Sequence, residues 1–243
     1  MTRGDYLRAL AAVAIWGSNF VVMKFGLQGL SPMLLGALRF AVAGLPFVLF
    51  VPRPQLPARF VLAYGAFQGL GQFGFLFMGL HLGMTAGMAS VVMQTQAFFT
   101  MLRAMPLLGE RARRQQWFGL AIAGVGLATI ALARGQGPGQ MTLIGFVLTL
   151  CASFMWACSN IVVRRAARVS PRYDPMALVV WSSLVPIAPF FIASAGRDGV
   201  ASVQASLADL SWRSAASVIF LALMATIAAY TLRTRLLQRH PAS

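Results

Sequence analysis

The sequence predicts an all-α integral membrane protein with about eight transmembrane helices. Hydrophobic residues make up 58% of the 243 residues, charged residues make up 10%, and the mean hydropathy is +0.74. Soluble domains carry about 25% charged residues. The chain is also divided into apolar runs of about 17 to 25 residues, each long enough to cross a bilayer as a helix. The net charge of +15 comes mostly from arginines between these runs, so we expect their partner to be membrane lipid and not nucleic acid.

The predicted helices follow one another with short breaks. They cover residues 8–27, 33–51, 60–80, 86–108, 116–133, 142–163, 176–195 and 214–232. The first run continues for a full helix length and further spans follow it, so we interpret it as a retained transmembrane helix and not as a signal peptide. Proline and glycine mark the breaks, for example at Ser31-Pro32 and from Arg134 to Gly139. Pro46, Pro186 and Pro189 should kink the second and seventh helices.

Two similar segments indicate an internal repeat. The stretch from Trp16 to Lys24 and the stretch from Trp156 to Arg164 each contain a tryptophan, a Ser-Asn pair, a short apolar run and a cation, about 140 residues apart. The first lies in the first helix and the second in the sixth. A period of five helices is odd, so the two copies must have opposite orientations, as in inverted-repeat transporters. We therefore predict a first repeat over 1–134 and a second over 140–243.

The distribution of basic residues predicts the orientation. Fourteen basic residues, including Arg164, Arg233 and Arg239, fall in loops on one side, and four fall in loops on the other. Arg39 and Arg103 fall within helices. Because cytoplasmic loops retain an excess of Lys and Arg, both termini are predicted to be cytoplasmic.

Polar residues within the predicted helices are the candidates for binding a solute. A charged side chain in hydrocarbon costs several kcal/mol, about 2.5–3.5 on insertion scales, so Arg39 either faces the bundle interior as a charge partner for a solute or gate, or pairs with carbonyl groups for structural reasons. Gln68 and Gln72 share one helix face because they are four residues apart. These amides either line a polar cavity or form hydrogen bonds between helices. The predicted substrate-binding residues are Trp16, Asn19, Arg39, Gln68, Gln72, Gln94, Gln96, Trp156 and Asn160.

The residues do not support enzymatic chemistry. The five acidic residues all lie in or beside loops, and the two histidines and two cysteines form no spacing typical of a metal site. No glycine-rich phosphate-binding loop is present. We expect no enzyme activity, no cofactor and no metal.

Several motifs together resemble the EamA-type branch of the drug/metabolite transporter superfamily, and within it the bacterial exporters of O-acetylserine and cysteine-pathway metabolites. Each motif is weak by itself, but their order and spacing extend through essentially the whole chain. They are Trp16-Gly17-Ser18-Asn19-Phe20, Leu38-Arg39-Phe40, the segments Ala89 to Val92 and Gln96 to Thr100, Gly109-Glu110-Arg111, and Trp156-Ala157-Cys158-Ser159-Asn160.

The resemblance implies a ten-helix fold made of two inverted five-helix repeats (5+5), with a central cavity between them. The sequence supplies helices 6, 7 and 8 of the second repeat, and the ninth and tenth have no counterpart in it. We therefore expect a C-terminally truncated version of this fold. A second copy of the chain, or another partner chain, is an alternative source of the two helices.

The function implied is secondary transport by alternating access, exporting small cysteine-like or O-acetylserine-like metabolites across the bacterial inner membrane. Broad drug and metabolite efflux is one alternative. A truncated membrane protein without transport activity is another. An exporter of organic cations is disfavoured because such a protein is expected to carry a carboxylate within the membrane, and Glu110 lies at a helix end.

Overall fold

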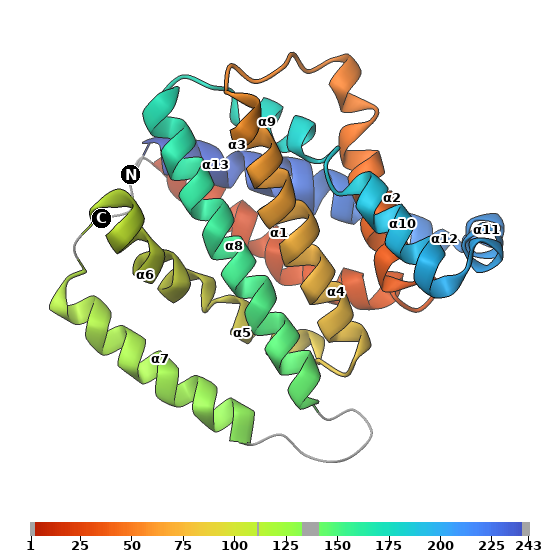
Figure 1. The fold of residues 1–243 in the computed structure, drawn as a ribbon, viewed down its shortest axis with the longest axis horizontal. Helices are drawn as coiled ribbons and strands as arrows, with labels where there is room; N and C mark the ends of the chain where they lie inside the picture. Colours follow the sequence, from red (N-terminus) through yellow and green to blue (C-terminus); the bar gives the residue numbers. More distant parts are fainter. Residues whose placement is uncertain (1–2, 111, 133–140, 240–243) are drawn as a thin grey trace.

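The computed structural model describes residues 3–110, 112–132 and 141–239, and the regular structure within these ranges is helical (Figure 1). The elements are α1 (Arg3–Gly26), α2 (Pro32–Gly44), η1 (Phe47–Leu49), α3 (Ala58–Tyr64), η2 (Gly65–Gln72), α4 (Phe73–His81), α5 (Ala86–Met93), α6 (Gln96–Leu108), α7 (Arg114–Leu132), α8 (Leu143–Val169), α9 (Pro175–Ser182), α10 (Ile187–Asp198), α11 (Val200–Ala208), α12 (Trp212–Ile219), η3 (Phe220–Ala228) and α13 (Ala229–Arg239).

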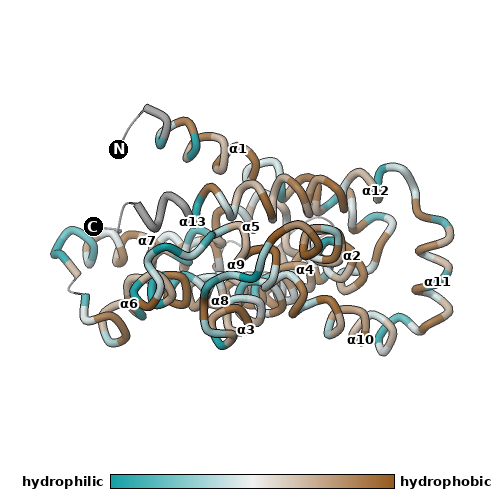
Figure 2. The backbone as a smooth tube through the Cα atoms, turned by 90° about the horizontal axis from the view of Figure 1, so that it is seen from above, coloured by the Kyte–Doolittle hydropathy of each residue, from teal (hydrophilic) through white to brown (hydrophobic). Residues whose placement is uncertain are grey.

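Six continuous helical segments in the described part of the chain are long and apolar enough to cross a membrane. They are Asp5–Gly26, Pro32–Leu49, Ala58–His81, Leu143–Val169, Pro175–Asp198 and Trp212–Thr234. Figure 2 shows the corresponding predominance of apolar residues along the helices. The predicted all-α membrane fold is confirmed. The range predicted as 116–133 is occupied by α7, which runs along the edge of the bundle with most of its side chains exposed (Figure 1).

The helix predicted over 86–108 is divided by the structure into α5 and α6. The break lies at Gln94 and Thr95, whose backbone amides bond three residues back, to Val91 at 3.0 Å and Val92 at 3.1 Å. The Thr95 hydroxyl also donates to the Val92 carbonyl at 2.7 Å and shares a hydrogen bond with Ser153 at 2.6 Å. A hydroxyl that bonds the preceding turn competes with regular helix geometry. This turn attaches the beginning of α6 to α8.

Two of the membrane-crossing segments contain a π-helical stretch. The first, η2, connects α3 to α4, and the second, η3, connects α12 to α13. Within η3 the Thr226 hydroxyl donates to the carbonyl of Leu221, five residues earlier, at 2.8 Å. A π-helical stretch widens the turn and is often found at functional sites. Here both stretches carry or adjoin polar residues that face the bundle interior.

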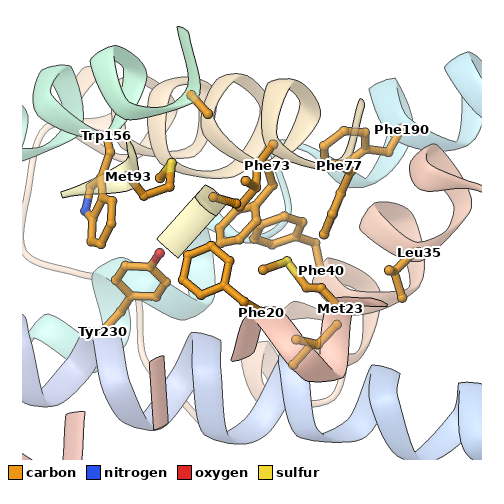
Figure 3. Packing of buried hydrophobic residues seen from close by; sticks show 14 of the residues in the cluster. Phe20, Met23, Leu35, Phe40, Phe73, Phe77, Met93, Trp156, Phe190 and Tyr230 are labelled. Carbon is orange, nitrogen blue, oxygen red and sulfur yellow. The ribbon is translucent and has the colours of Figure 1, made fainter. Parts of the chain in front are cut away.

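The core is organised around α8, which packs against η2, α4, α5 and α6 (Figure 1). On another side of the bundle, α1 packs against α12, η3 and α13. An aromatic cluster joins α2, α4 and α10: the ring centroids of Phe40 and Phe73 are 5.6 Å apart, and those of Phe40 and Phe190 are 6.1 Å apart (Figure 3). The start of α1 and the end of α13 lie at the same end of the bundle (Figures 1 and 2).

Two glycines allow η2 to approach the junction between α9 and α10. A Cβ on Gly65 would lie 2.6 Å from the carbonyl oxygen of Ser182 and 2.6 Å from Cβ of Val185. A Cβ on Gly69 would lie 2.8 Å from Cγ of Pro186. Small residues spaced four apart permit such close helix contact in membranes. The junction itself exists because α9 ends at Ser182 and Pro186 precedes α10, as the proline predicts.

We predict that Gly65→Ala destabilises the protein by about 1–3 kcal/mol, because the added methyl group has no room beside Ser182 and Val185. Gly74→Ala is the matched control, since its Cβ would lie an ordinary 3.5 Å from Phe190. Thermal unfolding of the purified protein in detergent measures both. Equal midpoints for the two variants would contradict the packing described here.

Candidate functional site

Buried polar side chains meet where η2, α8 and α13 come together, and we call this group the polar centre. Its members are Gln68, Gln72, Ser159, Asn160, Tyr230 and Arg233. All but Arg233 are at most 5% exposed. Because hydrocarbon offers no hydrogen bonds, polar groups in such a place must find partners within the protein.

The hydroxyl of Tyr230 is the hub of the polar centre. It accepts a hydrogen bond from Nε2 of Gln68 at 2.8 Å and another from Nε2 of Gln72 at 3.4 Å. The two glutamines also contact each other, Nε2 of Gln68 donating to Oε1 of Gln72. The Ser159 hydroxyl donates to Oε1 of Gln68 at 2.6 Å. These contacts connect η2, α8 and α13 through side chains alone.

Asn160 extends the polar centre to α6. Its Nδ2 donates to Oε1 of Gln96 at 2.7 Å and to the Thr100 hydroxyl at 2.9 Å. Its Oδ1 accepts a hydrogen bond from Nη2 of Arg233. The two donor contacts fix the orientation of the amide, so that its oxygen faces the guanidinium.

Aromatic rings enclose one side of the polar centre. The indoles of Trp16 and Trp156 pack edge to face with centroids 5.6 Å apart, and the Trp16 ring lies 5.2 Å from that of Tyr230. The guanidinium carbon of Arg233 lies 5.9 Å from the Trp16 centroid and 5.4 Å from the Trp156 centroid. Figure 3 shows Trp156 and Tyr230 beside the aromatic cluster that continues to Phe73. The two tryptophans of the predicted repeat therefore meet in space.

Arg39 lies next to the polar centre and is completely buried, with 0% exposure. Its Nε donates to the Thr226 hydroxyl at 2.8 Å, and its guanidinium carbon is 3.9 Å from the centroid of Phe73. Among the described residues, neither Nη atom of Arg39 has a hydrogen-bond partner. The side chain thus faces the bundle interior and is held by a hydroxyl and an aromatic face. Its role as a charge partner for a solute or gate stays a prediction.

The space at the polar centre is small in this conformation. A cavity lined by residues that include Tyr64, Gln68, Thr226 and Tyr230 has a volume of about 10 Å³. That volume holds about one water molecule. The part of the polar centre beside Gln68 and Tyr230 therefore has no room for a solute, which can enter there only if helices move apart.

The predicted binding residues do not all meet. Gln68, Gln72, Gln96, Asn160 and the two tryptophans are brought together by the contacts above. Asn19 is buried but contacts only the sulfur of Met23, at 4.0 Å, and its Oδ1 has no partner in the described part of the chain. Gln94 is exposed at the break between α5 and α6. These two side chains lack hydrogen bonds to the polar centre.

The structure adds Ser159, Tyr230 and Arg233 to the residues named from the sequence. The count of loop residues was wrong for several arginines that lie on helices, among them Arg8 on α1, Arg164 on α8 and Arg233 on α13. The guanidinium of Arg233 lies against two indole rings. Tyr230 and Arg233 are three residues apart, so they share one helix face. This spacing is the feature of the sequence that could have pointed to them as site residues. Without a tertiary contact, however, it resembles an ordinary helix end.

A cluster of arginines joins the ends of α6 and α8, and we call it the α6–α8 latch. Nη1 of Arg164 bonds both carboxylate oxygens of Glu110, at 2.9 and 2.8 Å. Arg165 donates to the carbonyl of Leu107 at 3.2 Å, and Arg168 donates to that of Leu108 at 3.3 Å. The last carbonyls of a helix have no partner within it, so cationic donors stabilise them. The latch holds the two helices together at one end of the bundle.

Comparison with known protein families assigns the chain to one of them. The model of the EamA-like transporter family matches residues 4–132. The chain belongs to the EamA-like transporter family. Its relatives include proteins named "Probable amino-acid metabolite efflux pump" from Salmonella typhimurium strain LT2 and Escherichia coli strain K12, each 42% identical over 99% of this chain and 80% of the relative. An "Uncharacterized inner membrane transporter YedA" of E. coli K12 is 30% identical over 62% of this chain and 50% of its own length.

Membership in the EamA family confirms the resemblance inferred from the sequence motifs. The chain is a multi-pass membrane transporter, and its family is not a family of enzymes. Within the described residues, no group of three or more His, Cys, Asp or Glu side chains is placed to hold a metal ion.

If the α6–α8 latch holds this end of the bundle closed, it should slow the labelling of Cys158, which is 5% exposed on α8. Glu110→Gln should speed labelling of Cys158 by a water-soluble thiol reagent about threefold, since a partly exposed charge pair contributes ~0.7 kcal/mol. Cys151→Ser in the background leaves Cys158 as the single reporter, and Asp209→Asn, at an exposed helix end, is the control. An unchanged rate in Glu110→Gln would show that the latch does not hold this end closed.

Proposed function

We propose that the chain exports small amino-acid metabolites, of the cysteine or O-acetylserine kind, across the bacterial inner membrane. The observation that carries the proposal is the polar centre, in which amides, hydroxyls and the Arg233 guanidinium from η2, α8 and α13 converge beside two indole rings. Such groups can bind the ammonium, carboxylate and polar side chain of a small zwitterion. The printed names of the two relatives with 42% identity agree with this class of solute.

In this proposal Gln68, Gln72, Gln96 and Asn160 supply hydrogen bonds to the solute, and Trp16 and Trp156 form the walls. Arg39, whose guanidinium lies against the ring of Phe73, contributes positive charge near the site. Asn19, whose Oδ1 has no partner in the described part of the chain, becomes a solute contact only after the helices rearrange. Gln94 takes no part, because it is exposed and lies beyond hydrogen-bond contact with the other residues.

The transport cycle we propose is alternating access. The cavity of about 10 Å³ corresponds to a closed state. The α6–α8 latch closes one end of the bundle, and we assign that end and both termini to the cytoplasm. Opening the latch admits the solute from the cytoplasm. Repeats over 1–134 and 140–243 would provide the two halves that move against each other.

The proposal is tested by counterflow in proteoliposomes that contain the purified chain. We expect exchange of labelled O-acetyl-L-serine or L-cysteine. Gln68→Leu should lower the initial rate about tenfold, because it removes an amide that orients both Ser159 and Tyr230. Gln204→Leu is the matched control, since Gln204 is exposed on α11 outside the bundle.

The result has a clear alternative outcome. If none of the amino-acid metabolites exchanges while the protein remains folded, export of this class is wrong. If Gln68→Leu and Gln204→Leu transport equally well, the polar centre is not the solute site. Elution volume and helix content of each variant establish that it is folded.

A further inference from the structure

The polar centre carries positive charge without a counter-charge. The five acidic residues of the chain are Asp5, Glu110, Asp174, Asp198 and Asp209. The salt bridges of the described residues pair Asp5 with Arg8, Glu110 with Arg164 and Asp198 with Arg197, all towards helix ends. Neither Arg39 nor Arg233 forms an ion pair with a carboxylate in the part of the chain that the structure describes. A buried cation without an anionic partner is costly, so its retention indicates a use.

Several buried donors at and beside the polar centre have no acceptor among the described residues. Nη1 of Arg233, Nε1 of Trp156 and both Nη atoms of Arg39 are buried and have no acceptor among the described residues. The Tyr230 hydroxyl already accepts from two glutamines, so its own proton is available as well. A ligand that satisfies these groups must be rich in acceptors and must carry an anionic group.

Arg233 differs from Arg39 in access. Arg39 is 0% exposed and its Nε is occupied by Thr226. Arg233 is only partly buried, and within the described ranges its one hydrogen bond goes to the neutral amide oxygen of Asn160. The indoles of Trp16 and Trp156 hold its guanidinium by cation–π contact. A solute that enters when the helices move apart can therefore bind Arg233 and replace a weak acceptor with a strong one.

We infer that Arg233 binds the carboxylate of the transported solute and thereby selects carboxylate-bearing metabolites over their esters and over organic cations. The inference rests on the proposed function in treating the polar centre as the solute site. The carboxylate takes Nη1 and Nη2 of Arg233 as a bidentate pair and releases Oδ1 of Asn160. Charge-assisted bidentate pairs are stronger than a hydrogen bond to a neutral amide. Arg39 adds long-range attraction without contact.

The release of Asn160 links binding to movement of α6. Asn160 lies one helical turn before Arg164, so the α8 face that bonds Gln96 and Thr100 continues into the α6–α8 latch. Once Arg233 has turned to the solute, Asn160 loses its third contact. Binding of the carboxylate thus weakens the hold on Asn160, the residue of α8 that bonds α6.

The test measures binding directly, so that it is independent of transport. O-acetyl-L-serine and its methyl ester are titrated into the purified full chain. Occupancy is followed by the change in the emission of its five tryptophans, two of which, Trp16 and Trp156, contact Arg233. We expect a saturable change with the acid and at least about tenfold weaker binding of the ester. Arg233→Lys keeps the charge but cannot form a bidentate pair, and should weaken binding of the acid about tenfold. Arg172→Gln, exposed between α8 and α9, is the control and should bind like the unaltered chain.

Each other outcome overturns the inference. Equal affinity for acid and ester, no binding of the acid, or full affinity in Arg233→Lys would exclude Arg233 as the carboxylate contact. If a variant does not fold, the comparison of acid with ester in the unaltered chain still decides. Binding of the acid through Arg233 without counterflow would overturn the export proposal and leave this inference intact. Equal counterflow of acid and ester would support export and overturn this inference.

Discussion

The hydrogen bonds to the Tyr230 hydroxyl connect parts of the bundle that are about 160 residues apart in sequence. In hydrocarbon an unsatisfied amide costs several kcal/mol, so Gln68 and Gln72 fix the position of α13 as firmly as apolar packing does. Ser159 and Asn160 then orient α8 and α6 in the same network. The path of each of these helices follows from the requirement that buried polar atoms find partners.

The irregular stretches of the helices serve the same requirement. The π-helical η2 presents Gln68 and Gln72 to the interior, and η3 places Thr226 against Arg39. The glycines of η2 let it approach Ser182 and Val185 closely. The turn at Thr95 starts α6 beside α8, where Gln96 reaches Asn160. Local departures from α-helix geometry therefore lie beside the residues that could bind a solute.

Apolar run length was enough to predict the all-α membrane fold, and the order and spacing of the motifs were enough to predict the family. The contact between Trp16 and Trp156 was not predicted; the sequence named both only as walls of a cavity. Hydropathy does not detect turns that side-chain hydroxyls form by hydrogen bonding. The break at Thr95 was therefore not predicted. Arg233 was missed for a related reason: near the end of an apolar run, an arginine that bonds Asn160 has the same sequence pattern as one in a loop. Exposure of Gln94 also depends on that break and not on its spacing from Gln96.

A closed polar centre with surplus donors, next to a latch between α6 and α8, accounts for binding and closure with the same helices. The most direct measurement is an experimental structure of the chain with O-acetyl-L-serine at saturating concentration. We predict carboxylate density within about 3 Å of both Nη atoms of Arg233, with the contact to Asn160 broken. Density confined to the cavity of about 390 Å³ beside Lys24, Gln28 and His81, with Arg233 still on Asn160, would contradict the assignment of the polar centre as the solute site.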